Sequence, residues 1–142
     1  MKLIVVVFLM VGLLGCEAIT NANQRPYIDV KLIGVWEGEY IEKRGTIKKW
    51  KQVRKADGTY KIDFSYTEVD GAVNNFSEIG KWWIKDGLFH ELAPSWMEEP
   101  DIYQYQFKKN CVSFVLVSGN ESTVVEEDYA FSECIPEDAP LV

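Results

Sequence analysis

The amino-acid sequence predicts an all-β protein, an antiparallel up-and-down meander of about eight strands that closes into a barrel. Apolar and polar residues alternate with a period of two from Leu32 onward, which is typical of half-buried strands. Asp57-Gly58 and Asp86-Gly87 are hairpin dipeptides between such runs. No segment has a helical period, although 93–100 has room for a short turn. Closing the sheet removes its exposed edges, and eight strands enclose either packed side chains or one small ligand.

Two runs carry the alternation most clearly. Tyr60, Ile62, Phe64 and Tyr66 alternate with polar residues, so one face of this strand is buried and the other is wet. A second run alternates aromatic residues with glutamine and lysine from position 103 to 108. The expected strands are 32–41, 46–55, 59–67, 76–85, 88–92, 102–109, 112–118 and 123–133.

The N-terminus carries a separate pattern. Met1-Lys2 precedes an apolar run from Leu3 to Leu14, which indicates a secretory signal, because a spanning helix needs roughly 20 apolar residues. The run ends in Leu13-Leu14-Gly15-Cys16, which resembles the lipobox of bacterial lipoproteins. That resemblance implies cleavage before Cys16 and attachment of a diacylglyceryl group to its thiol.

The expected organisation follows from this signal. Residues 1–15 form the signal peptide, 16–31 the lipidated N-terminus and tether, 32–134 the barrel domain and 135–142 a tail. Two acyl chains suffice for stable anchoring, so we expect a lipid-anchored protein of the bacterial cell envelope. Glu17 stands where an aspartate keeps enterobacterial lipoproteins in the inner membrane. The expected location is therefore the outer membrane, facing the periplasm, if the organism is Gram-negative.

The net charge of the chain limits the classes of partner that it can bind electrostatically. The net charge of −7 becomes −8 without the signal, because Lys2 is the only charged residue there. This acidity argues against nucleic acid and against electrostatic binding to an anionic membrane. It keeps a tethered domain soluble, and it also allows a basic protein partner.

Cys111 and Cys134 are an even pair in an exported chain, which predicts a disulfide. If a loop at 118–123 joined the last strands symmetrically, position 111 would lie opposite about 130. Cys134 would then be about 14 Å away, beyond the reach of a disulfide. Either the chain after Phe131 curls back, or a bulge shifts the register. We expect a staple that pins the tail to the turn near Asn110, with no redox role. No metal site is expected, since the two thiols and the single histidine lack metal-ligand spacing.

The first expected strand opens with Gly34-Val35-Trp36, followed by Glu37-Gly38. A Gly-x-Trp at this place resembles the lipocalin and wider calycin group. The resemblance implies a lipocalin-like barrel in which Trp36 closes one end and a cavity holds a small apolar molecule. The Trp36-x-Gly38 spacing is also similar to the start of nitrobindin-type haem barrels. Lipocalins usually place an arginine near the last strand against this tryptophan, and 122–142 contains no arginine or lysine.

Aromatic residues are the candidate ligand contacts, because such side chains line many small-molecule cavities. They also fill small barrels and favour strands, so both interpretations stay open. Trp82 and Trp83 are adjacent and must point to opposite faces of a strand. Trp96 is expected in a loop, where it anchors a partner or plugs the barrel mouth. The candidate ligand-binding residues are Trp36, Tyr60, Phe64, Tyr66, Trp82, Tyr103, Tyr105 and Phe107.

No catalytic pattern is present in the sequence. His90 is the one candidate haem ligand of its type, a role that needs an open cavity, and the alternative is an ordinary strand histidine. Glu126 and Glu127 are neighbours on an expected strand, so they face opposite ways and are not a paired acid and base. Without a hydrolase triad or a phosphate loop, the sequence predicts no enzyme and no cofactor.

Two hypotheses for function remain. The first is a lipid-anchored envelope lipoprotein whose barrel binds a small apolar ligand. The second is a filled barrel that acts as an interaction or inhibitor module toward an envelope protein, without a small-molecule ligand. The size of the interior discriminates between them, since ligand pockets enclose at least about 300 Å³.

Overall fold

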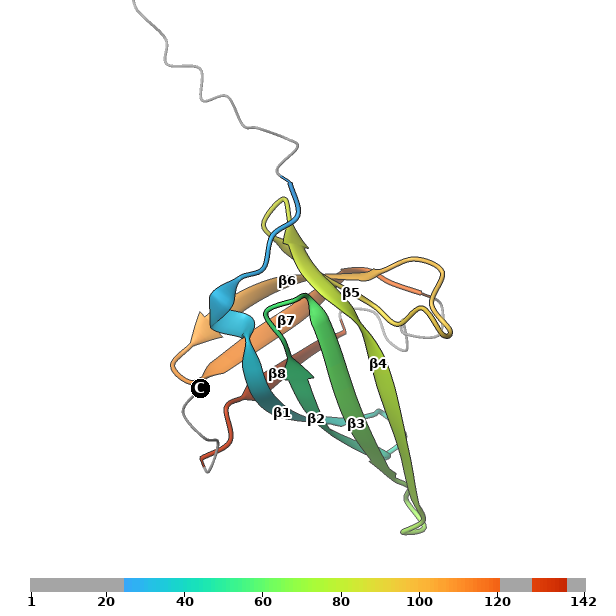
Figure 1. Cartoon of the computed structure of the whole chain (residues 1–142). Coiled ribbons are helices and arrows are strands. Elements are labelled where there is room, and N and C mark those ends of the chain that lie inside the picture. Colours follow the sequence, from blue (N-terminus) through green and yellow to red (C-terminus); the bar gives the residue numbers. More distant parts are fainter. Residues whose placement is uncertain (1–24, 121–128, 138–142) are drawn as a thin grey trace, which may run out of the picture.

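The chain forms a closed barrel of antiparallel strands in sequence order, as the computed structural model shows for residues 25–120 and 129–137 (Figure 1). Neighbouring strands pair along the whole series, and β1 closes the barrel against β8. The prediction of an all-β meander of eight strands is confirmed. Cys16 and the signal lie outside the described residues.

The elements follow one another with short connections. A 3₁₀ turn η1 precedes the first strand and is the helical element of the described residues. The elements are η1 (Val30–Leu32), β1 (Gly34–Ile41), β2 (Ile47–Arg54), β3 (Thr59–Thr67), β4 (Val73–Lys85), β5 (Leu88–Leu92), β6 (Asp101–Lys108), β7 (Cys111–Ser118) and β8 (Ala130–Cys134).

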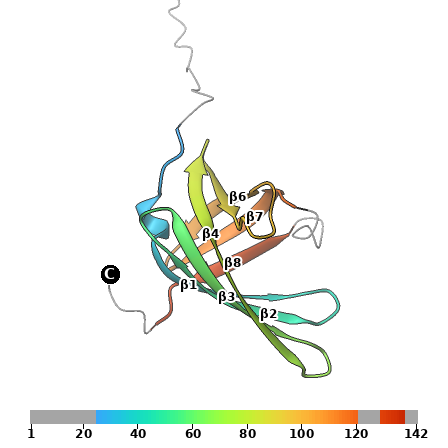
Figure 2. The ribbon, with the colours of Figure 1, turned by 45° about the vertical axis from the view of Figure 1, so that its right-hand side comes forward.

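Two strands begin three or more residues away from the expected position, and the other boundaries differ by at most two residues. β4 begins at Val73 instead of position 76, because the β3–β4 ladder extends to the pair of Thr67 with Val73. β8 spans Ala130–Cys134, and the expected strand residues 123–128 lie outside the described residues. The hairpins β1–β2 and β3–β4 extend beyond the other strands at one end of the barrel (Figure 2).

The opposite end of the barrel is closed by the N-terminal segment. Tyr27 pairs with Ile84 through two backbone hydrogen bonds, which adds the segment to the edge of β4. Leu32 of η1 is completely buried, and its carbonyl accepts a hydrogen bond of 2.9 Å from the Trp36 indole. The chain therefore joins the barrel at the closed end, beside the β4–β5 turn (Figure 1).

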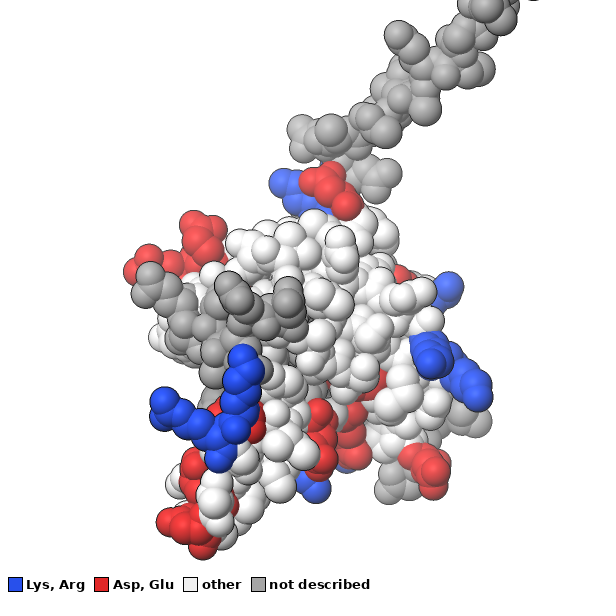
Figure 3. All heavy atoms as spheres, turned by 180° about the vertical axis from the view of Figure 1, so that it is seen from behind, with Lys and Arg blue, Asp and Glu red and all other residues white. Residues whose placement is uncertain are grey.

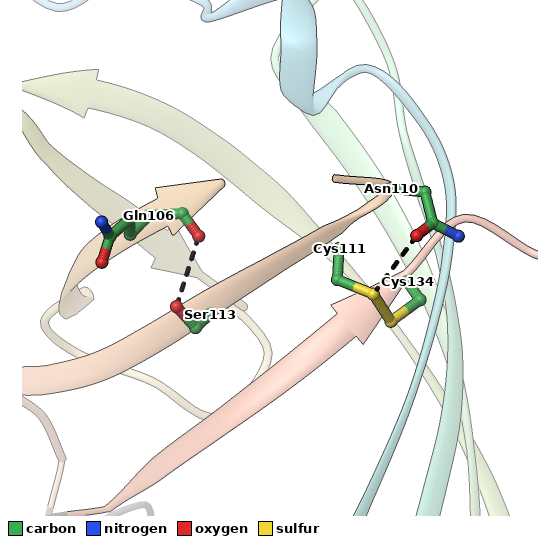
Figure 4. The surroundings of a disulfide bond; sticks show 5 residues. All are labelled: Gln106, Asn110, Cys111, Ser113 and Cys134. Carbon is green, nitrogen blue, oxygen red and sulfur yellow. Dashed lines mark hydrogen bonds between the residues drawn. A yellow bond between two sulfur atoms is a disulfide. The ribbon is translucent and has the colours of Figure 1, made fainter. Parts of the chain in front are cut away.

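The disulfide forms between directly paired residues of β7 and β8. Cys111 lies opposite Cys134, and their Cα atoms are 4.0 Å apart (Figure 4). The expectation that the chain after Phe131 curls back, or that a bulge shifts the register, is wrong. The connection between β7 and β8 is longer than a symmetric 118–123 loop, and it places Val115 opposite Ala130 in a regular ladder. The staple at the turn is confirmed, since the Ile135 amide donates to the carbonyl of Asn110.

Within the described residues, no helix has the length and apolar character needed to cross a membrane.

Candidate functional site

The barrel contains a cavity of about 450 Å³ that opens at the end opposite η1. Its walls combine aromatic rings with charged groups, which come from β1 to β6, from β8 and from the segments next to these strands. The lining residues are Tyr40, Glu42, Lys48, Trp50, Gln52, Ile62, Phe64, Tyr66, Phe76, Glu78, Glu91, Trp96, Met97, Asp101, Tyr103, Tyr129, Phe131 and Glu133.

Aromatic rings form the outer part of the cavity. The register aligns Trp50, Phe64 and Phe76 on three neighbouring strands, and the rings of Phe64 and Phe76 are stacked 4.7 Å apart. One step nearer the mouth, Lys48 pairs with Tyr66, and its ammonium lies 4.5 Å from the centre of the Phe64 ring. The mouth is therefore a layer of rings that already holds one cation.

A polar layer lies deeper in the barrel. Gln52 donates a hydrogen bond of 2.7 Å to Oε2 of Glu91 and accepts one of 2.7 Å from Arg54. Glu133 bridges Arg54 and the Trp50 indole, with both distances at 2.7 Å. These contacts connect β2, β5 and β8 across the interior, so buried polar groups are arranged as a network.

Two further carboxylates line the wall on the β4 and β6 side. Glu78 accepts hydrogen bonds from the Tyr60 hydroxyl and from the Trp96 indole, the latter at 2.7 Å. Asp101 accepts from the backbone and side-chain nitrogens of Asn120. Trp96 is about half exposed, so this bond folds a loop residue over the side of the cavity.

Arg54 forms the floor beneath the polar layer. Its side chain is 1% exposed, and its guanidinium lies 5.0 Å from the Phe89 ring centre, 5.3 Å from Phe114 and 6.0 Å from Trp36. The arginine that packs against the first-strand tryptophan thus comes from β2. Two of its nitrogens, Nε and Nη1, have no hydrogen-bond partner in the described part of the chain and face these rings instead.

Burial shifts the pKa values of the charged groups in the cavity. Desolvation raises the pKa of Glu91 to about 7, although the Arg54 guanidinium and the Gln52 amide favour its charged form. Desolvation also lowers the pKa of Lys48, and the surrounding carboxylates oppose that shift. The interior therefore carries an ionisable carboxyl close to neutral pH, beside a cation held among rings.

The eight candidate aromatics occupy three environments. Phe64, Tyr66 and Tyr103 line the cavity. Trp36, Tyr60 and Trp82 are buried below or behind its wall, each at most 2% exposed. Tyr105 and Phe107 are partly buried toward the closed end, where the Tyr105 hydroxyl donates to Asp29 and Lys31 lies over the Phe107 ring. Ligand contact by the first group remains a prediction.

Sequence reasoning missed the polar residues of the cavity. Lys48, Trp50, Gln52 and Arg54 share one face of β2; Lys48 is half-buried and the other three are buried, although three of the four residues are polar. The outer face of the same strand bears Lys49 and Lys51, so hydrophobic alternation gave no signal. The useful signal was Trp50, the single tryptophan of this strand. Since alternate residues of a strand point to the same face, its position marks the face that points inward.

His90 lies on the outer face of β5, between the inward Phe89 and Glu91. Its ring stacks on Trp83 with 5.3 Å between centres, and Nδ1 is 3.1 Å from the Leu88 carbonyl oxygen. It therefore does not reach the cavity, as a haem ligand would need to. Trp82 and Trp83 face opposite sides, as expected.

The outer surface carries no continuous basic patch on the face opposite to that of Figure 1. On the face in Figure 3, basic side chains lie in separate groups among acidic ones and form no continuous patch. The described residues contain no group of three His, Cys, Asp or Glu side chains placed to hold a metal ion. No protein-family model, curated protein or solved structure matches this chain.

Proposed function

We propose that this chain is a lipid-anchored protein of the bacterial envelope whose barrel binds a small molecule in its central cavity. The observation that carries the proposal is the interior volume of about 450 Å³, which exceeds the roughly 300 Å³ of the smallest usual ligand pockets. Half of the lining residues are aromatic, and convergent polar groups lie among them, a combination that small-molecule sites use.

The anchor half of the proposal rests on Leu13-Leu14-Gly15-Cys16 at the end of the apolar run. Substituting Cys16 with serine is expected to release the protein from membranes or to block processing of the signal. A variant that is processed normally and stays membrane-bound would contradict the anchor. With the anchor, the domain joins its tether at the closed end, so the mouth lies at the far end of the barrel from the tether.

The ligand half is tested by native mass spectrometry of the full-length protein purified from the cell that makes it. We expect an added mass that organic extraction removes. Ile62 lines the cavity and Ile79 lies on the outer face of the next strand. Ile62→Trp is expected to lose the added mass, and Ile79→Trp to keep it. A wild-type protein without added mass, and with no response of its tryptophan emission to apolar dyes, would refute the ligand half.

The filled-barrel interaction module requires an interior without space for a ligand. The cavity volume weighs against that alternative. The net charge of −7 is compatible with either function.

A further inference from the structure

We infer that the cavity takes an organic cation, an aromatic or similarly apolar body that carries one protonated amine, and that the amine enters first and binds at Glu91. This inference rests on the proposed ligand site and specifies its chemistry. It departs from the apolar ligand that the lipocalin resemblance implies.

The first reason for this inference is the net negative charge of the residues that line the cavity. Glu133 is neutralised by Arg54 at 2.7 Å, and Lys48 offsets one further carboxylate. An excess of negative charge remains, which attracts a cation and repels a carboxylate ligand. The charged residues that line the cavity are Glu42, Glu78, Glu91, Asp101 and Glu133 on the acidic side and Lys48 on the basic side.

The second reason is the order of the lining residues along the barrel axis, with polar groups deep in the cavity and aromatic rings near its mouth. The deep layer consists of Gln52, Glu91 and Glu133, whereas the rings of Phe64 and Phe76 lie nearer the mouth. An alkyl tail pushed into the deep layer would desolvate these polar groups without offering them hydrogen bonds, which is costly. A ligand with its polar group inward satisfies the deep layer and leaves its apolar body among the rings.

The choice of Glu91 follows from the hydrogen bonds of the two deep carboxylates and of Glu78 on the wall. Both oxygens of Glu133 accept hydrogen bonds, from Trp50 and Arg54, and both oxygens of Glu78 are also engaged. The hydrogen bond that Glu91 accepts from Gln52 uses Oε2. Among the described residues, Glu91 accepts fewer hydrogen bonds than Glu133 or Glu78, so it has the most acceptor capacity left for a ligand ammonium.

Lys48 is an example of an ammonium group that already lies against the aromatic rings of the cavity. Its ammonium lies 4.5 Å from the centre of the Phe64 ring, 5.7 Å from Tyr66 and 5.8 Å from Trp50. These rings thus already stabilise a positive charge in the outer cavity. A ligand amine that passes them meets the same favourable ring faces before it reaches the carboxylates.

The test uses three probes of one shape: tryptamine, tryptophol and indole-3-propionate. Binding to the full-length protein is measured by isothermal titration at pH 7.5. Tryptamine is expected to bind about tenfold more tightly than tryptophol, because a charge-assisted hydrogen bond replaces a neutral one, and indole-3-propionate most weakly. Glu91→Gln should remove most of the preference for the amine. Glu39→Gln, an exposed residue on the outer face of β1, should leave it unchanged.

The Lys48→Met variant distinguishes a cationic ligand from an anionic one. It is expected to strengthen tryptamine binding by removing a like charge from the cavity. Tightest binding of indole-3-propionate, lost in Lys48→Met, would overturn the inference while leaving a ligand-binding barrel in place. Binding of none of the probes would also overturn it, and the native mass measurement then decides separately whether the cavity holds another ligand.

Discussion

The indole of Trp50 lies directly against the backbone of Gly38 on the neighbouring strand. A Cβ atom at position 38 would be 2.2 Å from the nearest carbon of that ring, so only glycine fits beside it. The two residues are paired in the β1–β2 register, and the indole continues to Glu133 on β8 through a hydrogen bond of 2.7 Å. The contact explains the glycine of the Trp36-x-Gly38 pattern.

Gly38→Ala is therefore expected to displace Trp50 and to lower the free energy of unfolding by about 1–3 kcal/mol, the usual cost of an overpacked interior. Urea denaturation followed by tryptophan emission measures the loss. Combining Gly38→Ala with Trp50→Leu should recover part of it, since the smaller side chain leaves room for the methyl group. Equal stability of Gly38→Ala and wild type would contradict the contact.

Removing one member of the buried Arg54–Glu133 pair should be strongly destabilising. Both side chains are 1% exposed, so Glu133→Gln leaves the buried guanidinium without its hydrogen-bonded counter-charge, at a cost of about 3–5 kcal/mol. The matched control is Glu37→Gln, which breaks an exposed pair with Lys51 and should cost less than about 1 kcal/mol. Chemical denaturation of both variants at pH 7 provides the comparison, and similar losses would refute the buried pair.

Glu91 should make stability depend on pH near neutrality. Its pKa rises from 4.5 to about 7 on folding, because burial disfavours the carboxylate. The folded state therefore binds the proton more tightly. The contribution is fully present below pH 4.5 and is lost as the pH rises through about 7, a change on the order of 3 kcal/mol.

The measurement is the urea midpoint of wild type and Glu91→Gln from pH 5 to pH 8. The wild type should lose stability over this range, and the variant, which stays neutral, should lose less. Glu39→Gln should follow the wild type, since Glu39 lies at the surface in a pair with Lys49. Parallel pH profiles for wild type and Glu91→Gln would mean that another group titrates there.

The Cys111–Cys134 disulfide is expected to contribute about 3 kcal/mol to stability through the loop that it closes. Thiol titration of the denatured, unreduced protein should find neither thiol free. The double variant Cys111→Ser, Cys134→Ser should unfold at lower urea concentration than wild type. The probes of the cavity should bind the folded variant as before, because the bond lies at the β6–β7 turn, toward the closed end.

The sequence determined the order of the strands and the inward face of the most regular one, β3. Alternation with a period of two marked the face of Tyr60, Phe64 and Tyr66, and the Asp-Gly turns marked the β2–β3 and β4–β5 hairpins. The even pair of cysteines predicted the disulfide. All of these features depend on residues close in sequence or on cysteine chemistry, so a linear reading recovers them.

Only the tertiary structure decided how deep each inward side chain lies in the barrel and which other side chains it contacts. Tyr60 and Phe64 share a face, yet Tyr60 is buried against Glu78 while Phe64 lines the cavity, because strand tilt and register set the height of each residue in a closed barrel. Arg54 meets Glu133 across 79 positions of sequence, through closure of β1 on β8. Periodicity specifies which way a side chain points, and closure specifies what it meets.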